Sequence, residues 1–190
     1  TIQSYLTKLN VLNTYERGLV RWQASINDGI TPTSSVYTFD YTGSGSNAVL
    51  NNILLPEYID PARTMRPADT KWIDEVSQQS LIQSYNLAFS NGSEKNTSFI
   101  SLSFFNHEGI IKGSNSQKIT SRVNNDYKFL DGKLKVGQNL SVSYLNNTEI
   151  PTGDVMYLSL VQQPIVPVYS VDGGWGGPAP GMTDRHNPVR

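Results

Sequence analysis

The chain has 190 residues, of which 16% are charged, with 15 Lys and Arg against 16 Asp and Glu. This near-neutral balance excludes nucleic acid as an expected partner, because phosphate neutralisation needs a concentration of cations. The absence of Cys excludes disulfide frameworks, thiolate metal sites and Cys nucleophiles. Uncharged polar residues take the place of charges, which is typical of porin lumens, adhesins and sugar-binding sheets.

The chain has no stretch near the roughly 18 consecutive apolar residues that a membrane-spanning helix needs. It starts without Met and without the basic and apolar pattern of a signal peptide. We therefore expect it to be a piece of a longer protein.

Residues 1–80 predict a helix followed by a long loop. Gly29 and Pro32 mark the end of the helix, and no period persists from residue 31 to residue 68, where Gly43–Ser46 and three prolines predict a loop. A short helical turn is predicted over Asp69–Val76. The helix itself is predicted by apolar residues three and four apart, namely Leu6, Leu9, Leu12, Tyr15, Leu19, Trp22 and Ile26.

Within residues 81–150 the apolar period changes to two, which predicts strands with one apolar and one polar face. Four strands are expected, around residues 85–89, 100–104, 118–129 and 134–144. The polar face of the third strand carries the charged residues Lys118, Arg122, Asp126 and Lys128. Residues 151–190 are expected to add a further strand and a loop rich in Gly and Pro.

The connections between these strands alternate in length. Asn91–Lys95 and Asp131–Gly132 predict tight hairpin turns, whereas Asn106–Gln117 predicts a longer loop. Strands of about ten residues with one apolar face, joined by alternating short and long connections, are the signature of a transmembrane β-barrel. A soluble antiparallel sheet with one wet face explains the alternation equally well.

Several longer runs carry a family resemblance over most of the chain, most strongly from Asp69 to Tyr144. The runs are Asp69–Val76, Leu81–Leu87, Ser90–Lys95, Phe99–Leu102, Asn106–Lys112, Tyr127–Phe129, Gly132–Gly137 and Gly173–Arg190. They resemble the early barrel region of the SusC/RagA family of TonB-linked outer-membrane transporters.

The resemblance implies an all-β fold, part of a transmembrane antiparallel barrel, in which residues 1–80 form a helix-bearing extracellular loop region. It implies import of oligosaccharides or peptides across the outer membrane of a Gram-negative bacterium, energised by the TonB complex through regions absent from this chain. A SusD-like lipoprotein and outer-membrane lipid are the implied partners. Lys118, Arg122, Asp126 and Lys128 are expected to face the lumen or the plug, because Lys or Arg facing lipid costs about 2–4 kcal/mol at the midplane.

The sequence predicts no catalytic, cofactor or metal site. His107 and His186 are the two histidines, and neither has the spacing of a catalytic or metal site. His186 could join Asp172 in a cation site, but a solvated loop is the better interpretation. Gly43–Ser46 lacks the Lys and the helix start of a phosphate loop.

Three aromatic residues are candidates for ligand binding. Trp175 lies among four glycines, where an exposed indole can stack on a sugar ring, although such a residue often fills a local gap. Tyr37 and Tyr41 alternate with Phe39 as in a short strand and could line a vestibule. The rival interpretation from another class is a soluble or surface-anchored β-sandwich that binds glycans, with its apolar strand faces buried against a second sheet.

Overall fold

The computed structural model describes residues 2–3, 9–178 and 187–190. These residues form two compact units. The first contains residues 77–150 and the short strand β1 (Ile2–Gln3), and the second contains the described residues of 9–76 and 151–190. None of the helices in these ranges is long and apolar enough to cross a membrane.

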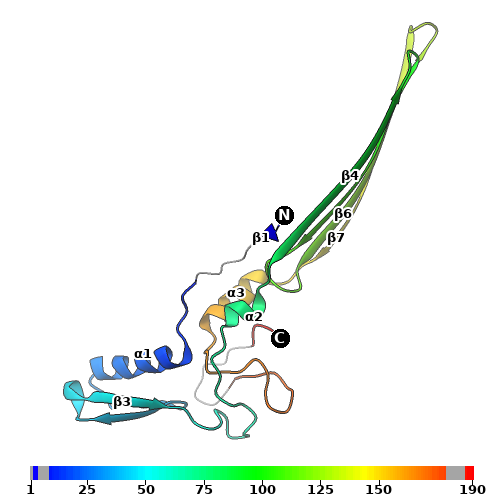
Figure 1. The fold of residues 1–190 in the computed structure, drawn as a ribbon. Coiled ribbons are helices and arrows are strands. Elements are labelled where there is room, and N and C mark those ends of the chain that lie inside the picture. Colours follow the sequence, from blue (N-terminus) through cyan, green and yellow to red (C-terminus); the bar gives the residue numbers. More distant parts are fainter. Residues whose placement is uncertain (1, 4–8, 179–186) are drawn as a thin grey trace. The chain divides into compact units, whose positions relative to one another are not determined.

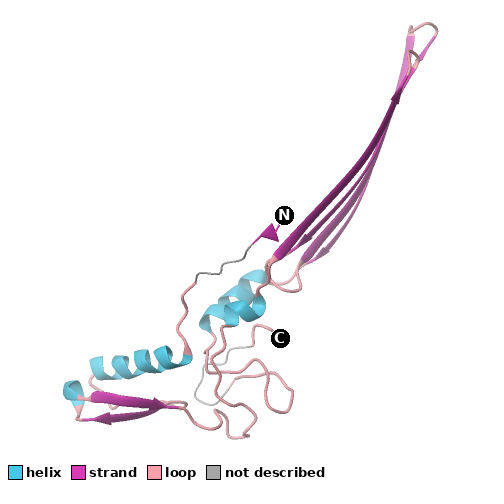
Figure 2. Ribbon diagram, viewed as in Figure 1, coloured by secondary structure: helices cyan, strands magenta, loops and turns pink. Residues whose placement is uncertain are grey.

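The first unit is an antiparallel sheet in the order β1-β4-β5-β6-β7. Its four long strands run side by side as a gently curved ribbon (Figures 1 and 2). The four strands predicted within residues 81–150 are confirmed, each longer than its apolar pattern, as β4 (Ser80–Gly92), β5 (Asn96–Glu108), β6 (Asn115–Phe129) and β7 (Leu134–Thr148).

The connections within the sheet follow the prediction at one end and differ from it at the other. Residues 93–95 and 130–133 are tight turns, and Leu130 and Asp131 both adopt positive φ, at 53° and 52°. The predicted long loop at 106–117 is shorter than expected, because β5 continues to Glu108 and β6 starts at Asn115. Inside the remaining loop, Ile111 is buried and forms an isolated bridge with Ser77.

The predicted N-terminal helix exists but starts later than its apolar period suggested. Helix α1 spans Thr14–Asn27, and Leu6 lies outside the described residues. Asn13 and Glu16 form a capping box in which the Asn13 side chain accepts the Glu16 N–H at 2.8 Å and Glu16 accepts the Asn13 N–H at 2.9 Å. Such a reciprocal cap fixes the first turn, so Leu9 and Leu12 precede the helix.

Residues 31–68 are not only a loop, as the sequence suggested. They contain an antiparallel hairpin of β2 (Thr38–Thr42) and β3 (Val49–Leu54), joined through a short 3-10 turn, η1 (Gly45–Asn47). Helix α1 packs closely on this hairpin, because a Cβ at Gly18 would lie 3.2 Å from the Ile53 side chain on β3 and 3.1 Å from the ring of Tyr37, which precedes β2. The glycines at 43 and 45 adopt positive φ in the turn.

A further strand was expected after residue 150, but the chain forms a helix there, α3 (Thr152–Val161). Helix α3 contacts α2 (Trp72–Val76). Beyond α3, residues 163–168 run through the core of the second unit without regular structure. Trp72 donates its indole N–H to the Gln163 carbonyl at 3.0 Å. The buried core residues are Val36, Tyr37, Ile53, Ile59, Met65, Trp72, Ile165 and Val166.

A substitution at Gly176 can test how tightly residues 163–178 are packed. The Gly176 N–H donates to the Val168 carbonyl at 2.9 Å, and a Cβ added at Gly176 would collide with the Pro167 carbonyl oxygen. We expect Gly176→Ala to destabilise the second unit by about 1–3 kcal/mol through overpacking. Limited proteolysis of the full-length protein should then cut this segment faster.

Gly153→Ala is the matched control, because a Cβ at this helical position meets nothing within 4 Å. We expect it to leave the cleavage rate unchanged or lower, since Ala favours helix over Gly. Equal cleavage rates for the two variants would contradict the tight approach of Gly176 to Pro167.

Candidate functional site

One face of the β4–β7 sheet is apolar in successive cross-strand rows. The register places Tyr85 opposite Phe104, Phe104 opposite Ile119, and Ile119 opposite Tyr144. The next two rows continue the apolar surface, with Leu87, Leu102, Ser121 and Val142, and then Phe89, Ile100, Val123 and Leu140.

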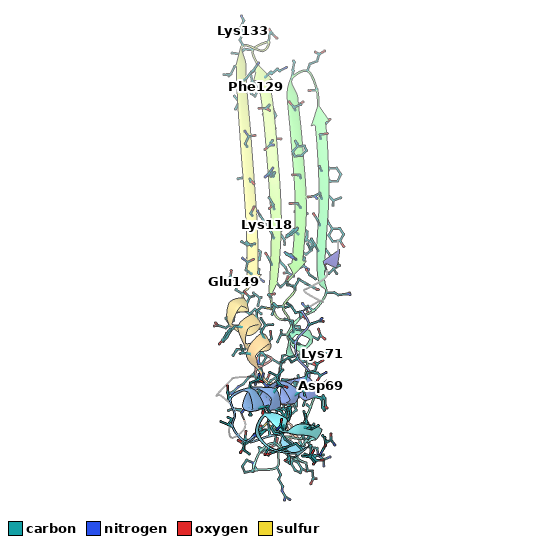
Figure 3. All side chains as sticks on the ribbon, turned by 90° about the vertical axis from the view of Figure 1, so that its left-hand side faces the viewer. Asp69, Lys71, Lys118, Phe129, Lys133 and Glu149 are labelled. Carbon is teal, nitrogen blue, oxygen red and sulfur yellow. The ribbon has the colours of Figure 1, made fainter. Side chains whose placement is uncertain are left out.

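At the hairpin end, the same face carries aromatic and aliphatic residues. Tyr127 and Phe129 stack with ring centroids 6.2 Å apart, and Figure 3 shows Phe129 and Lys133 near the tips of the strands. One polar row interrupts the apolar surface. It contains Asn91, Ser98, Asn125 and Gln138.

This apolar face is exposed over most of its area. Phe89 is 71% exposed, Val142 59% and Leu140 50%. Every residue of β7 is exposed, and along its outer edge the described residues supply no neighbouring strand. Long apolar faces and open edges of this kind require further partners, because an unpaired edge leaves a row of unsatisfied N–H and C=O groups.

The opposite face of the sheet is polar and carries the four charged residues predicted to face the lumen. Lys118, Arg122, Asp126 and Lys128 alternate on β6 with the apolar positions, so the structure places them on one face. Sequence reasoning left Lys135 out of this set, although it lies directly opposite Lys128 on β7. The alternation along β7 could have identified Lys135, because it places this residue on the face away from the apolar residues of Leu134–Tyr144.

A hollow of about 350 Å³ lies on this polar face and is called here the cationic hollow. The hydroxyl group of Thr120, one of its lining residues, lies 3.0 Å from that of Ser143 on the neighbouring strand. The lining combines two cations, an aromatic ring and small polar groups, from Asn86, Ser101, Ser103, Phe105, Lys118, Thr120 and Arg122.

Trp175, the aromatic candidate in the Gly-rich loop, is 43% exposed and forms an isolated bridge with Tyr169. The two rings lie 5.0 Å apart between centroids, and Tyr169 is 59% exposed. Sequence reasoning missed Tyr169, since no periodic pattern joins it to Trp175. Together the rings form an exposed aromatic pair on the second unit.

Asp172 holds the turn between these two aromatic residues. Its carboxylate accepts hydrogen bonds from the Ser170 hydroxyl and from the Gly174 N–H, and these bonds lower the pKa of Asp172 below its ordinary value. The turn therefore presents the aromatic pair on an ordered backbone. His186, which the sequence suggested as a cation-site partner of Asp172, lies outside the described residues.

The other two aromatic candidates differ from each other. Tyr37 is 3% exposed and packs in the core, and burial raises the pKa of its phenol. Its hydroxyl is buried without a hydrogen-bond partner. The Tyr37 ring therefore serves packing in this structure and is not accessible to a ligand, whereas Tyr41 on β2 is half-buried.

No cluster of three or more His, Asp or Glu side chains suited to a metal occurs in the described ranges. His107 lies on β5, with its ring edge-on to Phe105 at 6.3 Å between centroids. Its position on β5, beside an aromatic ring, differs from the long Asn106–Gln117 loop that the sequence predicted.

Asp60 is the carboxylate that organises the 57–66 loop, and sequence reasoning did not single it out. Its carboxylate accepts the Met65 N–H at 2.7 Å and the Thr64 hydroxyl at 2.8 Å. Desolvation acts to raise the pKa of Asp60, but these hydrogen bonds outweigh it and hold the pKa below its ordinary value of 3.8.

This shift predicts an acid-sensitive loop. Because the folded pKa of Asp60 is depressed, its stabilisation is present above the unfolded pKa and is lost as pH falls through the folded pKa. Hydrogen exchange of the full-length protein from pH 6 to pH 2 should show the Thr64 and Met65 amides losing protection below about pH 4. Asp60→Asn should lower protection at pH 6 and flatten the profile, while Asp40→Asn in β2 should leave it unchanged.

Comparison with known proteins finds similarity to TonB-dependent receptors over part of the chain. No protein-family model matches the chain. It is 32% identical over 107 residues to the TonB-dependent receptor P26 of Formosa agariphila, covering 56% of this chain and 10% of that protein. It is 29% identical over 116 residues to the TonB-dependent receptor P3 of the same organism, covering 56% of the chain and 12% of that protein.

A third relative comes from another organism. The chain is 30% identical over 106 residues to the TonB-dependent receptor SusC of Bacteroides thetaiotaomicron, covering 54% of this chain and 10% of that protein. It thus spans about a tenth of the length of the curated relatives that it matches. Over rather more than half of its residues, the chain is related to the TonB-dependent receptors, SusC among them.

Proposed function

We propose that the β4–β7 sheet is a section of the barrel wall of a TonB-dependent outer-membrane transporter. The observation that carries this proposal is the two-faced sheet, which is apolar and exposed on one side and polar on the other. A transmembrane barrel needs this alternation, because one face meets lipid while the other lines a wet lumen. Barrel closure would also pair the open outer edge of β7.

The length of the apolar face supports the proposal. From Ile119 to Phe129 the face of β6 covers eleven residues, whose ten steps of ~3.4 Å give a length of about 34 Å. A strand tilt of about 45° reduces this to a height of ~24 Å, close to the apolar band of ~25 Å in outer-membrane barrels. Aromatic residues lie at both ends, as interfacial girdles require.

The connections give the orientation of the strands. In outer-membrane barrels the short turns are periplasmic and the longer connections are extracellular. Residues 93–95 and 130–133 are therefore periplasmic. Residues 109–114 are extracellular. The second unit is extracellular too, because it joins the sheet before β4 and after β7.

The whole transporter would import oligosaccharides or peptides, energised by the TonB complex through regions outside this chain and assisted by a SusD-like lipoprotein. The chain contributes no catalysis. Within the extracellular part, the Tyr169–Trp175 pair is the candidate for contact with cargo, since its rings are exposed and ordered by the Asp172 turn. Tyr41 remains a weaker candidate, and the core position of Tyr37 argues against a role for that residue.

The rival glycan-binding sandwich has less support. It requires Leu134, Val136, Leu140 and Val142 to be buried against a second sheet. In the described residues these side chains are 47–59% exposed. Exposure to lipid explains such a face without a further protein layer.

A direct test uses the full-length gene, expressed with its own leader in a Gram-negative host. Outer membranes are extracted and the protein is run unboiled and boiled on a denaturing gel. A closed barrel should give a heat-modifiable band found only in the outer membrane. A soluble protein whose gel mobility does not change on boiling would contradict the transporter proposal and favour the glycan-binding sandwich.

Two adjacent substitutions test which face meets lipid. Leu140→Lys places a cation on the apolar face and should cost up to about 2–4 kcal/mol near the midplane, which lowers the yield of heat-modifiable barrel. Asn139→Lys is the matched control, because Asn139 lies on the polar face opposite the uncharged Asn124. Equal yields of folded barrel from the two variants would contradict the assignment of the faces.

A further inference from the structure

The polar face of the sheet carries an excess of positive charge. Among its described residues, four cations, Lys118, Arg122, Lys128 and Lys135, stand against one carboxylate, that of Asp126. All five side chains are exposed. Lys128 and Lys135 lie directly opposite each other, an arrangement that destabilises a sheet unless negative charge is close.

Within the described part of the sheet, none of these four cations forms an ion pair. In a closed barrel this face would line a narrow lumen with low-dielectric walls, where charges of one sign focus the field and concentrate counter-ions. Rings of Lys and Arg are also the means by which anion-selective pores choose their cargo. The lumen section built by these strands therefore favours a negatively charged occupant.

The cationic hollow gives this preference a definite site. Lys118 and Arg122 are four residues apart on one face of β6, or ~13 Å along the strand. Between them lies Thr120, and around them Asn86, Ser101 and Ser103 provide small polar groups. The ring of Phe105, directly opposite Lys118, adds an apolar surface that is 37% exposed.

The lining suits a charged sugar chain better than an inorganic ion or a peptide helix. Guanidinium and ammonium groups bind carboxylate or sulfate through charge-assisted hydrogen bonds. Hydroxyl and amide groups match sugar hydroxyls, and an exposed aromatic ring can pack on the apolar face of a sugar. Two cations separated along an extended strand match successive anionic groups on an extended chain.

The hollow also lies in the half of the sheet where cargo would arrive. Lys118 lies toward the end opposite the Phe129 and Lys133 tips (Figure 3), and that end is extracellular in the proposed orientation. The Lys128 and Lys135 pair lies near the opposite, periplasmic end.

We propose that the cationic hollow binds anionic groups of the imported cargo, so that the cargo is an oligosaccharide bearing carboxylate or sulfate groups. This inference rests on the proposed function, since it needs the polar face to line a transport lumen. The competing occupant is an acidic segment of the same protein that fills the lumen. In that case Lys118 and Arg122 would stabilise the receptor and not select its cargo.

The test compares uptake by the full-length receptor of three probes of equal length, a neutral, a carboxylated and a sulfated oligosaccharide. Wild type should favour the charged probes, with a preference that falls as salt rises. Lys118→Ser with Arg122→Ser should lower uptake of the charged probes by about tenfold, the loss expected from removing charge-assisted contacts. Uptake of the neutral probe should be unchanged.

Lys128→Ser with Lys135→Ser is the matched control, because it removes the same charge from the same face outside the hollow. It should keep most of the preference for charged probes. The inference is overturned if the wild-type receptor shows no preference for charged probes, or if the hollow variant keeps that preference. It is also overturned if both variants lose the preference equally, or if the hollow variant loses uptake of all three probes to the same extent.

The heat-modifiable band of wild type and of each variant reports whether a folded barrel forms. It therefore distinguishes failure of this inference from failure of the proposed function. A folded barrel without charge preference overturns only the anionic cargo. Absence of a folded barrel in wild type removes the transport lumen itself, and with it both proposals.

Discussion

The hydrogen-bond ladder that runs unbroken from β4 to β7 is the constraint on which the rest of the first unit depends. Once Phe104 is fixed opposite Ile119, every other residue of the two strands is assigned to a face, because a shift of one residue would exchange the faces. The apolar rows, the cationic hollow and the open edge of β7 all follow from that single register. A shift of register in one strand pair would therefore alter both faces of the sheet at once.

The second unit depends on a different interaction, the burial of irregular backbone. The Pro164, Ile165 and Val166 carbonyls accept hydrogen bonds from the N–H of Thr70, the N–H of Ala68 and the hydroxyl of Thr70. Buried carbonyls need partners of this kind, because leaving them unpaired costs several kcal/mol. Segments almost a hundred residues apart thus hold each other in place, with the four long strands of the first unit between them in the sequence.

This contrast explains what the sequence could and could not predict. The strands are local, since the alternation from Ile119 to Phe129 is visible in β6 alone, and the placement of its charged residues on the polar face follows from the same alternation. Helix α1 was misplaced at its start because the capping box of Asn13 and Glu16 outweighs the apolar period. Helix α3 contacts α2, a segment distant in the sequence, and no local pattern predicts this contact. Tyr169 and Trp175 are brought together by the Asp172 turn, whose hydrogen bonds leave no periodic pattern in the sequence.

The two hairpin tips of the sheet end at different levels. The last pair of the β4–β5 hairpin, Gly92 with Thr97, aligns with Asp126, whereas the β6–β7 hairpin continues to Phe129 and Leu134, three residues further. Three residues are ~10 Å, and the two hairpins lie two strand spacings apart, also ~10 Å. A line through both tips therefore crosses the strands at about 45°. If that line is the level rim of a barrel, the stagger already encodes the strand slope of ~35–45° that closure requires.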